Sequence, residues 1–218
     1  EEILANELKI LGAQEVEQGV RMVSFKGDKG FMYKANLSLR TALKILKPIY
    51  FFKATNESQL YKGVQGINWS KFISANQTFV IDATVHSTHF NHSEFISQKC
   101  KDAIVDQFRD RTGQRPSIDK AHPDLRINIH IDKDQVSVAL DTSGNSLHQR
   151  GYRSATNIAP INEVLAAGLV LLSGYSGDEN FIDPMCGSGT ILIEACMIAC
   201  KIPANINRKQ FAFERWKN

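Results

Sequence analysis

The chain of 218 residues lacks the sequence features that several classes of protein require. No apolar run approaches the length of a membrane span and no signal peptide is visible, so we predict a cytoplasmic protein with no membrane partner. The four cysteines form no C-x-x-C pair, and the histidines His86, His89 and His92 have no cysteine or carboxylate pair at zinc-ligand spacing beside them. We therefore predict neither a disulfide framework nor a metal site.

The charge and composition are those of an ordinary globular protein of one large or two small domains. The formal net charge is +3, with 43% hydrophobic and 22% charged residues. This charge allows a nucleic-acid partner without requiring one. No G-x-x-x-x-G-K-[ST] segment occurs, which excludes a P-loop, and no Pro-Pro pair occurs anywhere in the chain.

The segment 181–195 joins a short apolar run to a helical pattern through a loop with two glycines. Residues 181–182 are predicted to end a buried strand, and Gly187 and Gly189 let the loop backbone approach a ligand where a side chain would collide. Thr190 then opens a helix, whose free N–H groups and positive dipole end face the loop. The pattern therefore predicts a ligand site over this loop.

The loop does not fit a dinucleotide. A G-x-G-x-x-G motif seats a pyrophosphate, and here Leu192 stands at the third glycine position. An acidic residue at the strand end, Asp183, followed by small residues suits a ligand with an ammonium and a carboxylate. The methionine part of S-adenosylmethionine is such a ligand, and Asp183 would hold its charge or a water near it.

Residues 183–195, Asp-Pro-Met-Cys-Gly-Ser-Gly-Thr-Ile-Leu-Ile-Glu-Ala, resemble the S-adenosylmethionine-binding motif of the THUMP-domain-containing RNA methyltransferases. The resemblance is to the bacterial family that methylates N2 of guanine in large-subunit ribosomal RNA, formerly grouped with N6-adenine-specific DNA methylases. Arg-Gly-Tyr-Arg (150–153) and Ala-Pro-Ile-Asn-Glu-Val-Leu-Ala-Ala (159–167) are similar to its linker and first methyltransferase helix. The cofactor-binding residues that the resemblance implies are Asp183, Met185, Cys186, Gly187, Ser188, Gly189 and Thr190, with Pro160 and Glu194 as supports.

Pro160 and Glu194 also have alternative roles that are purely structural. A proline near the start of a helix serves helix initiation, which is the alternative role of Pro160. An acidic residue near a helix N-terminus complements the helix dipole, which is the alternative role of Glu194.

The first part of the chain is predicted to be a short α+β segment. Apolar residues recur at helical spacing over 2–11, residues 16–25 have the composition of strands, and 27–39 and 42–52 indicate a second helix and a further strand. The resemblance assigns residues 1–52 to a ferredoxin-like segment that lacks its first strand.

The middle of the chain predicts a β-α-β-β unit. Apolar and polar residues alternate over 79–85, and two further alternations within 125–140 read as a hairpin. A helix with an apolar stripe lies between them, with Asn91 or Ser93 available as its cap. The resemblance assigns residues 53–145 to a THUMP domain, which binds RNA.

The remaining residues are assigned to a linker, 146–158, and to the beginning of a methyltransferase domain, 159–218. The predicted fold class is therefore α/β with an α+β N-terminal part. It comprises a ferredoxin-like segment, a THUMP domain and the start of a Rossmann-like class I methyltransferase domain.

Candidate RNA contacts lie on the central helix and in the linker. Basic residues on the helix alternate with acidic ones, which from sequence alone favours a solvated helix face with i,i+4 ion pairs. The resemblance favours RNA contact by these basic residues instead. The segment 142–162 has no acidic residue, so its arginines suit phosphate contact, or equally a linker that packs on the methyltransferase core. The candidates are Lys99, Lys101, Arg109, Arg111, Arg115, Arg150, Tyr152 and Arg153.

Only residues 191–218 follow the loop, fewer than the mostly parallel seven-stranded sheet of this class needs. Enzymes that methylate amino groups hold the target amine with an Asn/Asp-Pro-Pro-Tyr/Phe loop, which is absent. We therefore expect part of an S-adenosylmethionine-dependent RNA methyltransferase, cut within its catalytic domain, inactive alone and without catalytic residues of its own. Two alternatives stay open: an adenine-N6 nucleic-acid methyltransferase, and a non-catalytic module that binds ribosomal or other structured RNA.

Overall fold

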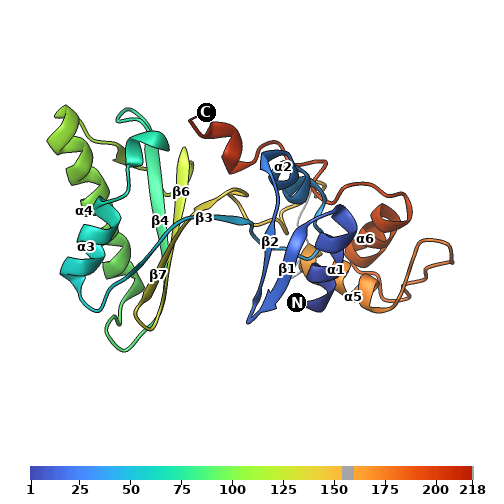
Figure 1. Ribbon diagram of the computed structural model, residues 1–218. Helices are drawn as coiled ribbons and strands as arrows, with labels where there is room; N and C mark the ends of the chain where they lie inside the picture. The colour runs from blue at the N-terminus through green and yellow to red at the C-terminus, as the bar shows by residue number, and fades with distance from the viewer. Residues whose placement is uncertain (154–159, 218) are drawn as a thin grey trace. The chain divides into compact units, whose positions relative to one another are not determined.

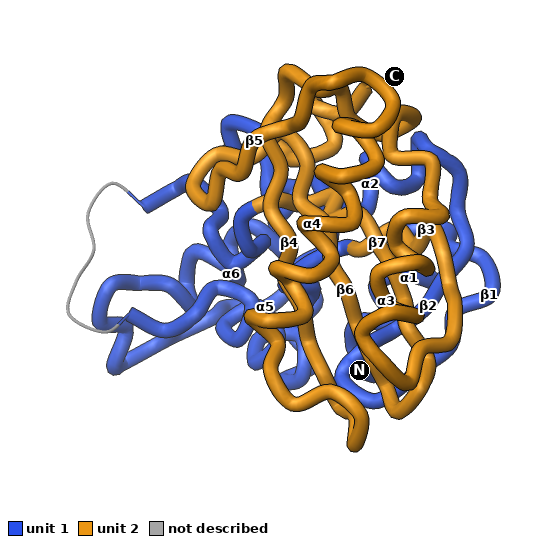
Figure 2. Tube along the Cα trace, turned by 90° about the vertical axis from the view of Figure 1, so that its left-hand side faces the viewer, with its two compact units in different colours: residues 1–45, 145–210 blue, residues 46–144, 211–218 orange. Residues whose placement is uncertain are grey.

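The computed structural model of the chain describes residues 1–153 and 160–217. The chain divides into two compact units, each built from separate stretches of sequence (Figure 2). Unit 1 comprises residues 1–45 and 145–210, and unit 2 comprises residues 46–144 and 211–218.

Unit 1 begins with a helix, a hairpin and a second helix. Helix α1 (Glu2–Leu11) ends at Gly12, which takes a left-handed conformation with φ 99°. Strands β1 (Gln14–Gly19) and β2 (Met22–Lys26) pair antiparallel. Helix α2 (Lys29–Ser38) begins at Asp28, whose carboxylate accepts a hydrogen bond from the Phe31 N–H. These elements confirm the pattern predicted for the start of the chain.

Two further helices complete unit 1. Helix α5 (Glu163–Leu172) begins at Asn162, whose side chain accepts from the N–H groups of Val164 and Leu165. It packs against α6 (Thr190–Ala199), which begins at Gly189. Both helices bury small side chains toward the interior of the unit, among them Ala166, Ala167 and Ala195.

The buried strand predicted to end at residues 181–182 does not form. Phe181 and Ile182 have no regular structure, and Ile182 is 83% exposed. Within the described part of unit 1 the only sheet is the β1–β2 hairpin. A strand needs a neighbouring strand to pair its backbone N–H and C=O groups, and none lies beside this segment among the described residues of unit 1.

Unit 2 is a five-stranded sheet with two helices on one face (Figure 1). The strand order is β3-β7-β6-β4-β5, in which β4 runs parallel to β6 and β6 forms an antiparallel hairpin with β7. Within the described ranges no helix is long and apolar enough to cross a membrane. The elements are β3 (Leu46–Lys53), α3 (Glu57–Gln65), η1 (Trp69–Lys71), β4 (Thr78–His86), α4 (Ser93–Thr112), β5 (Ser117–Ile118), β6 (Leu125–Asp132), β7 (Gln135–Asp141) and η2 (Ala212–Arg215).

The core of unit 2 lies between the sheet and helices α3 and α4. Phe79, Ile127 and Ile129 project from the sheet, and Trp69 and Ile104 meet them from the helical layer, each with no exposed surface. The alternation seen in the sequence therefore places the apolar set on the helix-covered face, and the predicted β-α-β-β unit is confirmed.

Three details of unit 2 differ from the prediction. Strand β3 pairs with β7, so the strand expected over 42–52 lies in this sheet and not with the N-terminal segment. The N-cap of α4 is His92, which makes no side-chain cap hydrogen bond, so neither Asn91 nor Ser93 caps this helix. Helix α3 was not predicted, although its cap is visible in the sequence: Asn56 accepts from the Gln59 N–H at 3.0 Å.

Candidate functional site

The loop before α6 is a tight turn that requires glycine. The Gly189 N–H donates to the Cys186 carbonyl at 2.7 Å, and the Asp183 carboxylate accepts from the Met185 N–H at 3.0 Å. Gly187 and Gly189 have φ values of 53° and 73°, in the left-handed region that side chains disfavour. The two glycines of the sequence motif therefore shape the backbone that leads into α6.

The outer side of this loop is open. A Cβ atom added to Gly187 or Gly189 would meet no atom within 4 Å. Met185 is 89% exposed and Ser188 is exposed, whereas Thr190 is 2% exposed. The first N–H groups of α6 have no intrahelical partners and lie at this end of the helix. The loop thus combines backbone donors with one carboxylate, Asp183, beside free space, and this donor set fits a ligand that carries both an acceptor oxygen and a positive group.

An arginine joins the loop to the start of α5. The Arg153 Nε lies 2.5 Å from Oε1 of Glu163, in the first turn of α5. Its Nη2 donates to the Ile161 carbonyl and to Thr190 Oγ1, both at 3.0 Å. Thr190 Oγ1 lies 3.2 Å from Ser188 Oγ, so a continuous set of polar contacts runs from α5 to the middle of the loop.

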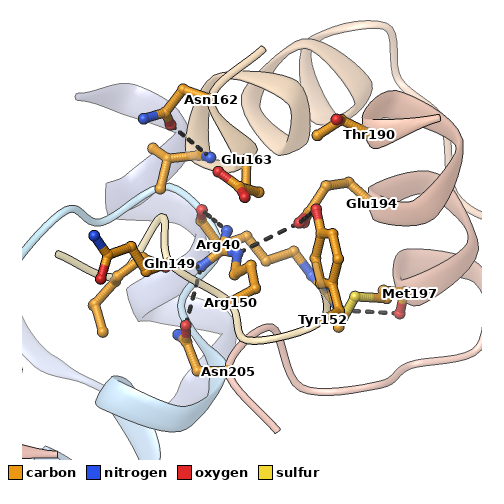
Figure 3. A network of polar contacts seen from close by, with 12 residues as sticks. Arg40, Gln149, Arg150, Tyr152, Asn162, Glu163, Thr190, Glu194, Met197 and Asn205 are labelled. Carbon is orange, nitrogen blue, oxygen red and sulfur yellow. Dashed lines mark hydrogen bonds and ion pairs between the residues drawn. The ribbon is translucent and has the colours of Figure 1, made fainter. Parts of the chain in front are cut away.

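A second network, centred on a buried ion pair, lies one helical turn further along α6 (Figure 3). Arg150 Nε lies 3.4 Å from Glu194 Oε1, and neither side chain has exposed surface. Arg150 also donates to the Leu147 carbonyl at 2.9 Å and to Asn205 Oδ1 at 3.4 Å. The Tyr152 hydroxyl donates to Glu194 Oε1 at 3.1 Å. Figure 3 shows Arg150 and Tyr152 directed toward this carboxylate from the segment 150–153.

Burial dominates the protonation equilibria of this network. It raises the pKa of Glu194, although Arg150, the Tyr152 hydroxyl and Arg40 act in the opposite direction. Burial and the neighbouring Glu194 carboxylate raise the pKa of Tyr152. Tyr152 therefore remains a hydrogen-bond donor at neutral pH.

The N-terminal segment holds the far end of the same helix. Arg40 Nη2 donates to the carbonyls of Met197 at 3.1 Å and Ile202 at 2.6 Å, where α6 ends. A positive charge at this end complements the helix dipole. The Asn205 side chain donates to the Asn36 carbonyl at 2.9 Å. Residues 1–45 therefore contribute directly to the placement of the helix that begins at the loop.

These positions correct the predicted roles of the linker residues. Arg150 has no exposed surface and its guanidinium is directed inward, so the expectation that it contacts RNA phosphates is wrong. Tyr152 and Arg153 are half-buried and bind the helices α5 and α6, as the packing alternative supposed. Glu194 lies beyond the first turn of α6, which holds no acidic residue, so first-turn complementation of the helix dipole does not explain it. Local sequence did not indicate the contacts with α6, because Tyr152 and Arg153 lie 42 and 37 residues from their partners Glu194 and Thr190.

Pro160 lies away from the helix start that it was expected to serve. Helix α5 begins at Glu163 with Asn162 as its cap, so helix initiation does not explain Pro160. Pro160 is exposed and lines a cavity of about 460 Å³ together with His148 and Arg153. Residues 154–158 of the predicted linker lie outside the described residues, as does Ala159 of the segment 159–167.

The basic residues predicted on α4 and just after it fall into two groups. Lys101, Arg109 and Arg115 line one groove of about 430 Å³ beside β5, together with Asp102 and Asp106. The remaining two lie elsewhere, with Lys99 paired to Glu57 and Arg111 bonded to Asn68.

Acidic partners occupy part of this basic set. Arg109 pairs with Asp106 at 2.9 Å and Lys101 with Asp102 at 3.0 Å, as the alternative of a solvated, charge-paired face supposed. Arg115 is exposed at the rim of the groove. No three His, Cys, Asp or Glu side chains in the described ranges gather as metal ligands.

Comparison with known families gives three matches along the chain. The RlmL ferredoxin-like domain matches residues 1–46, the THUMP domain residues 54–141, and the RMKL-like methyltransferase domain residues 150–218. The sequence is 42% identical over 220 residues to a ribosomal RNA large subunit methyltransferase K/L from Syntrophotalea carbinolica. That alignment covers 99% of this chain and 31% of the relative, so the chain spans about a third of the relative's length.

Solved structures agree with these matches. A predicted N6-adenine-specific DNA methylase from Listeria monocytogenes is 33% identical and superposes with a TM-score of 0.86, over 99% of this chain and 56% of that one. The methyltransferase SMU.472, solved in complex with SAH, is 35% identical with a TM-score of 0.84 over the same shares. Over these three matched domains the chain is similar to the THUMP-domain-containing methyltransferases.

Proposed function

We propose that the loop 183–190 holds S-adenosyl-L-methionine and that the complete gene product methylates N2 of guanine in large-subunit ribosomal RNA. The open, glycine-shaped space before α6 is the observation that carries this proposal. The ribosomal RNA methyltransferase from Syntrophotalea carbinolica and the SAH complex of SMU.472 support the RNA substrate and the cofactor, respectively. We place the activity in the cytoplasm.

Within this proposal, each group of the loop 183–190 has a role in binding the cofactor. When bound, S-adenosylmethionine supplies an electrophilic methyl group. The backbone N–H groups at the start of α6 would bind the carboxylate of its methionine part, and Asp183 would bind its ammonium group or a water beside it. Met185, Cys186 and Ser188 would line the site, and the glycines would keep the backbone close to the ligand.

Unit 2 would supply the RNA contacts. Lys101, Arg109 and Arg115 share one groove and can neutralise phosphates, although two aspartates in that groove reduce its positive charge.

The proposed domain division follows the sequence analysis, 1–52, 53–145, 146–158 and 159–218, with one change. Because β3 belongs to the sheet of unit 2, we move the first boundary to residue 45.

The decisive experiment replaces a loop glycine in the complete gene product. Gly189→Val places a branched side chain in the open space before α6 and strains a residue at φ 73°. We expect the affinity for S-adenosylhomocysteine to fall by more than about tenfold, the change that corresponds to 1.4 kcal/mol. Isothermal titration calorimetry measures this affinity, and a thermal melt verifies folding.

Gly113→Val is the matched control. Gly113 has φ 69° and equally open surroundings, but it ends α4 in unit 2. It should suffer the same backbone strain without loss of cofactor affinity. A folded Gly189→Val protein that binds the homocysteine product like the wild type would refute the cofactor site.

Methyl transfer distinguishes the remaining functions. With radiolabelled cofactor, the complete gene product should label guanine in ribosomal RNA, whereas the 218-residue chain alone should give only background. Label in adenine would support the adenine-N6 alternative. RNA binding by the complete product without any transfer would leave only the non-catalytic RNA-binding module.

A further inference from the structure

We propose that Arg153 is a positioning residue that orients two hydroxyl groups, those of Thr190 and Ser188, so that Ser188 donates its hydrogen to an acceptor oxygen of the ligand at the loop. The inference rests on the proposed function for the presence of that ligand. It assigns to the segment 150–153 a role in cofactor recognition in place of RNA contact.

The direction of the first hydrogen bond is fixed by chemistry. A guanidinium group only donates, so Thr190 Oγ1 accepts from Arg153 Nη2, at 3.0 Å. The arginine is itself held at two other points, by the Glu163 carboxylate and by the Ile161 carbonyl. Glu163 has a side chain only 6% exposed, so this ion pair is held in a partly desolvated site.

The direction of the second hydrogen bond follows from burial. Thr190 is 2% exposed, and its hydroxyl hydrogen needs an acceptor, because a buried donor left unpaired is costly. Among the described residues, the acceptor in contact with this hydroxyl is Ser188 Oγ, at 3.2 Å. If Ser188 donated to Thr190 instead, the Thr190 hydrogen would have no partner there. Thr190 therefore donates and Ser188 accepts.

The consequence lies at the surface of the loop. Ser188 is exposed, and its own hydrogen remains available on the side of the open space before α6. A hydroxyl that already accepts a hydrogen bond is a stronger donor, because successive hydrogen bonds polarise one another. The ligand group that such a donor recognises is an anionic or carbonyl oxygen, next to the N–H groups of the same helix end.

Four single variants of the complete gene product test this order of contacts. Arg153→Gln and Thr190→Val should each weaken binding of S-adenosylhomocysteine about tenfold, because each removes the bond that sets the direction. Thr190→Ser keeps the hydroxyl and should bind like the wild type. Ser188→Ala should weaken binding to the same extent as Arg153→Gln.

The double variant separates orientation from a general structural role. In the Ser188→Ala background, Arg153→Gln should cause no further loss of affinity, because the hydroxyl that it orients is gone. Losses that multiply in the double variant would overturn the proposal, as would a Thr190→Val protein with wild-type affinity. Because Thr190→Val preserves side-chain shape, it remains informative if Arg153→Gln fails to fold.

Arg208→Gln is the matched arginine control. The Arg208 guanidinium donates to the carbonyls of Asn145, Ser146 and Gln149 in the same unit. Its loss should lower the melting temperature without changing the affinity for S-adenosylhomocysteine. If the wild-type protein itself shows no binding, the cofactor proposal fails, whereas wild-type binding with multiplying losses refutes only the role of Arg153.

Discussion

The ion pair of Arg150 and Glu194 allows a quantitative test of the network behind α6. Both side chains have no exposed surface, and Glu194 depends on Arg150 and the Tyr152 hydroxyl for its hydrogen bonds. Replacing Arg150 by methionine keeps the volume but leaves a buried carboxylate without its main counter-charge. Breaking a buried pair in this way costs about 3–5 kcal/mol, so we expect unit 1 to lose about 4 kcal/mol of unfolding free energy.

A second substitution reveals the origin of that loss. In the double variant Arg150→Met with Glu194→Gln, no unpaired charge remains, so the protein should be more stable than Arg150→Met alone. The difference is the part of the loss that comes from the isolated carboxylate. Equal destabilisation of the single and double variants would refute the electrostatic explanation and leave only lost packing.

The pH dependence of folding stability also tests the ion pair of Arg150 and Glu194. Burial is the main cause that raises the pKa of Glu194 above its ordinary value of 4.5, so its protonation stabilises the folded state and stability falls as pH rises through the folded pKa. Arg150 is the strongest opposing influence, ahead of Tyr152 and Arg40, and its removal should raise the pKa further. Arg150→Met should therefore lose more stability than the wild type as the pH rises above 4.5, the ordinary pKa of the Glu194 carboxyl.

Hydrogen–deuterium exchange of peptides from α6 measures this effect in unit 1. Both tryptophans, Trp69 and Trp216, belong to unit 2, so tryptophan fluorescence during urea unfolding follows the other unit as an internal control. We expect exchange in α6 to become faster as the pH rises above 4.5, beyond the intrinsic chemical difference, and this increase should be greater in the variant.

Two further predictions concern unit 2. Gln107, 5% exposed, accepts from the Trp69 N–H and donates to the carbonyls of Gln65 and Ile67. Gln107→Leu should therefore leave two buried backbone groups and the partly buried Gln65 carbonyl without this partner. We expect a cost of about 1–3 kcal/mol for each buried group, seen as a lower urea midpoint in tryptophan fluorescence. For RNA binding, each neutralised phosphate contributes about 0.7–0.9 to the slope of log affinity against log salt concentration. Replacing Arg115 with glutamine should therefore reduce that slope by about this amount. An unchanged slope would exclude Arg115 as a phosphate contact.

Elements with a regular period were predictable because the period depends on local sequence alone. The alternation over 79–85 and 125–140 gave the strands and their buried face, and the helical spacing over 2–11 gave α1. Strands without such a periodic pattern were not predictable from the sequence. Residues 181–182 were predicted as a strand from composition, but a strand also requires a partner, which composition does not report.

In the candidate site, too, local sequence predicts some features and does not predict others. The positive φ values of Gly187 and Gly189 follow the glycine pattern of the loop, because only glycine adopts them without strain. The inward direction of Arg150 could not be read from its neighbours, since its partners include Arg40, 110 residues earlier, and Asn205, 55 residues later. An arginine flanked by polar residues has the same local sequence whether it faces solvent or a buried carboxylate.

Both units are assembled from sequence segments that the ribosome makes at widely separated times. Asn36 receives its hydrogen bond from Asn205, 169 residues later, and Trp216 packs against the core of the unit that begins at residue 46. A nascent chain that ends at residue 144 therefore has neither unit complete. Contacts of this separation require long loops to close and form late in folding. No single cut between residues 1 and 218 can isolate either unit with all of its parts, so a fragment that ends before residue 211 should expose apolar surface of unit 2 that Trp216 normally covers.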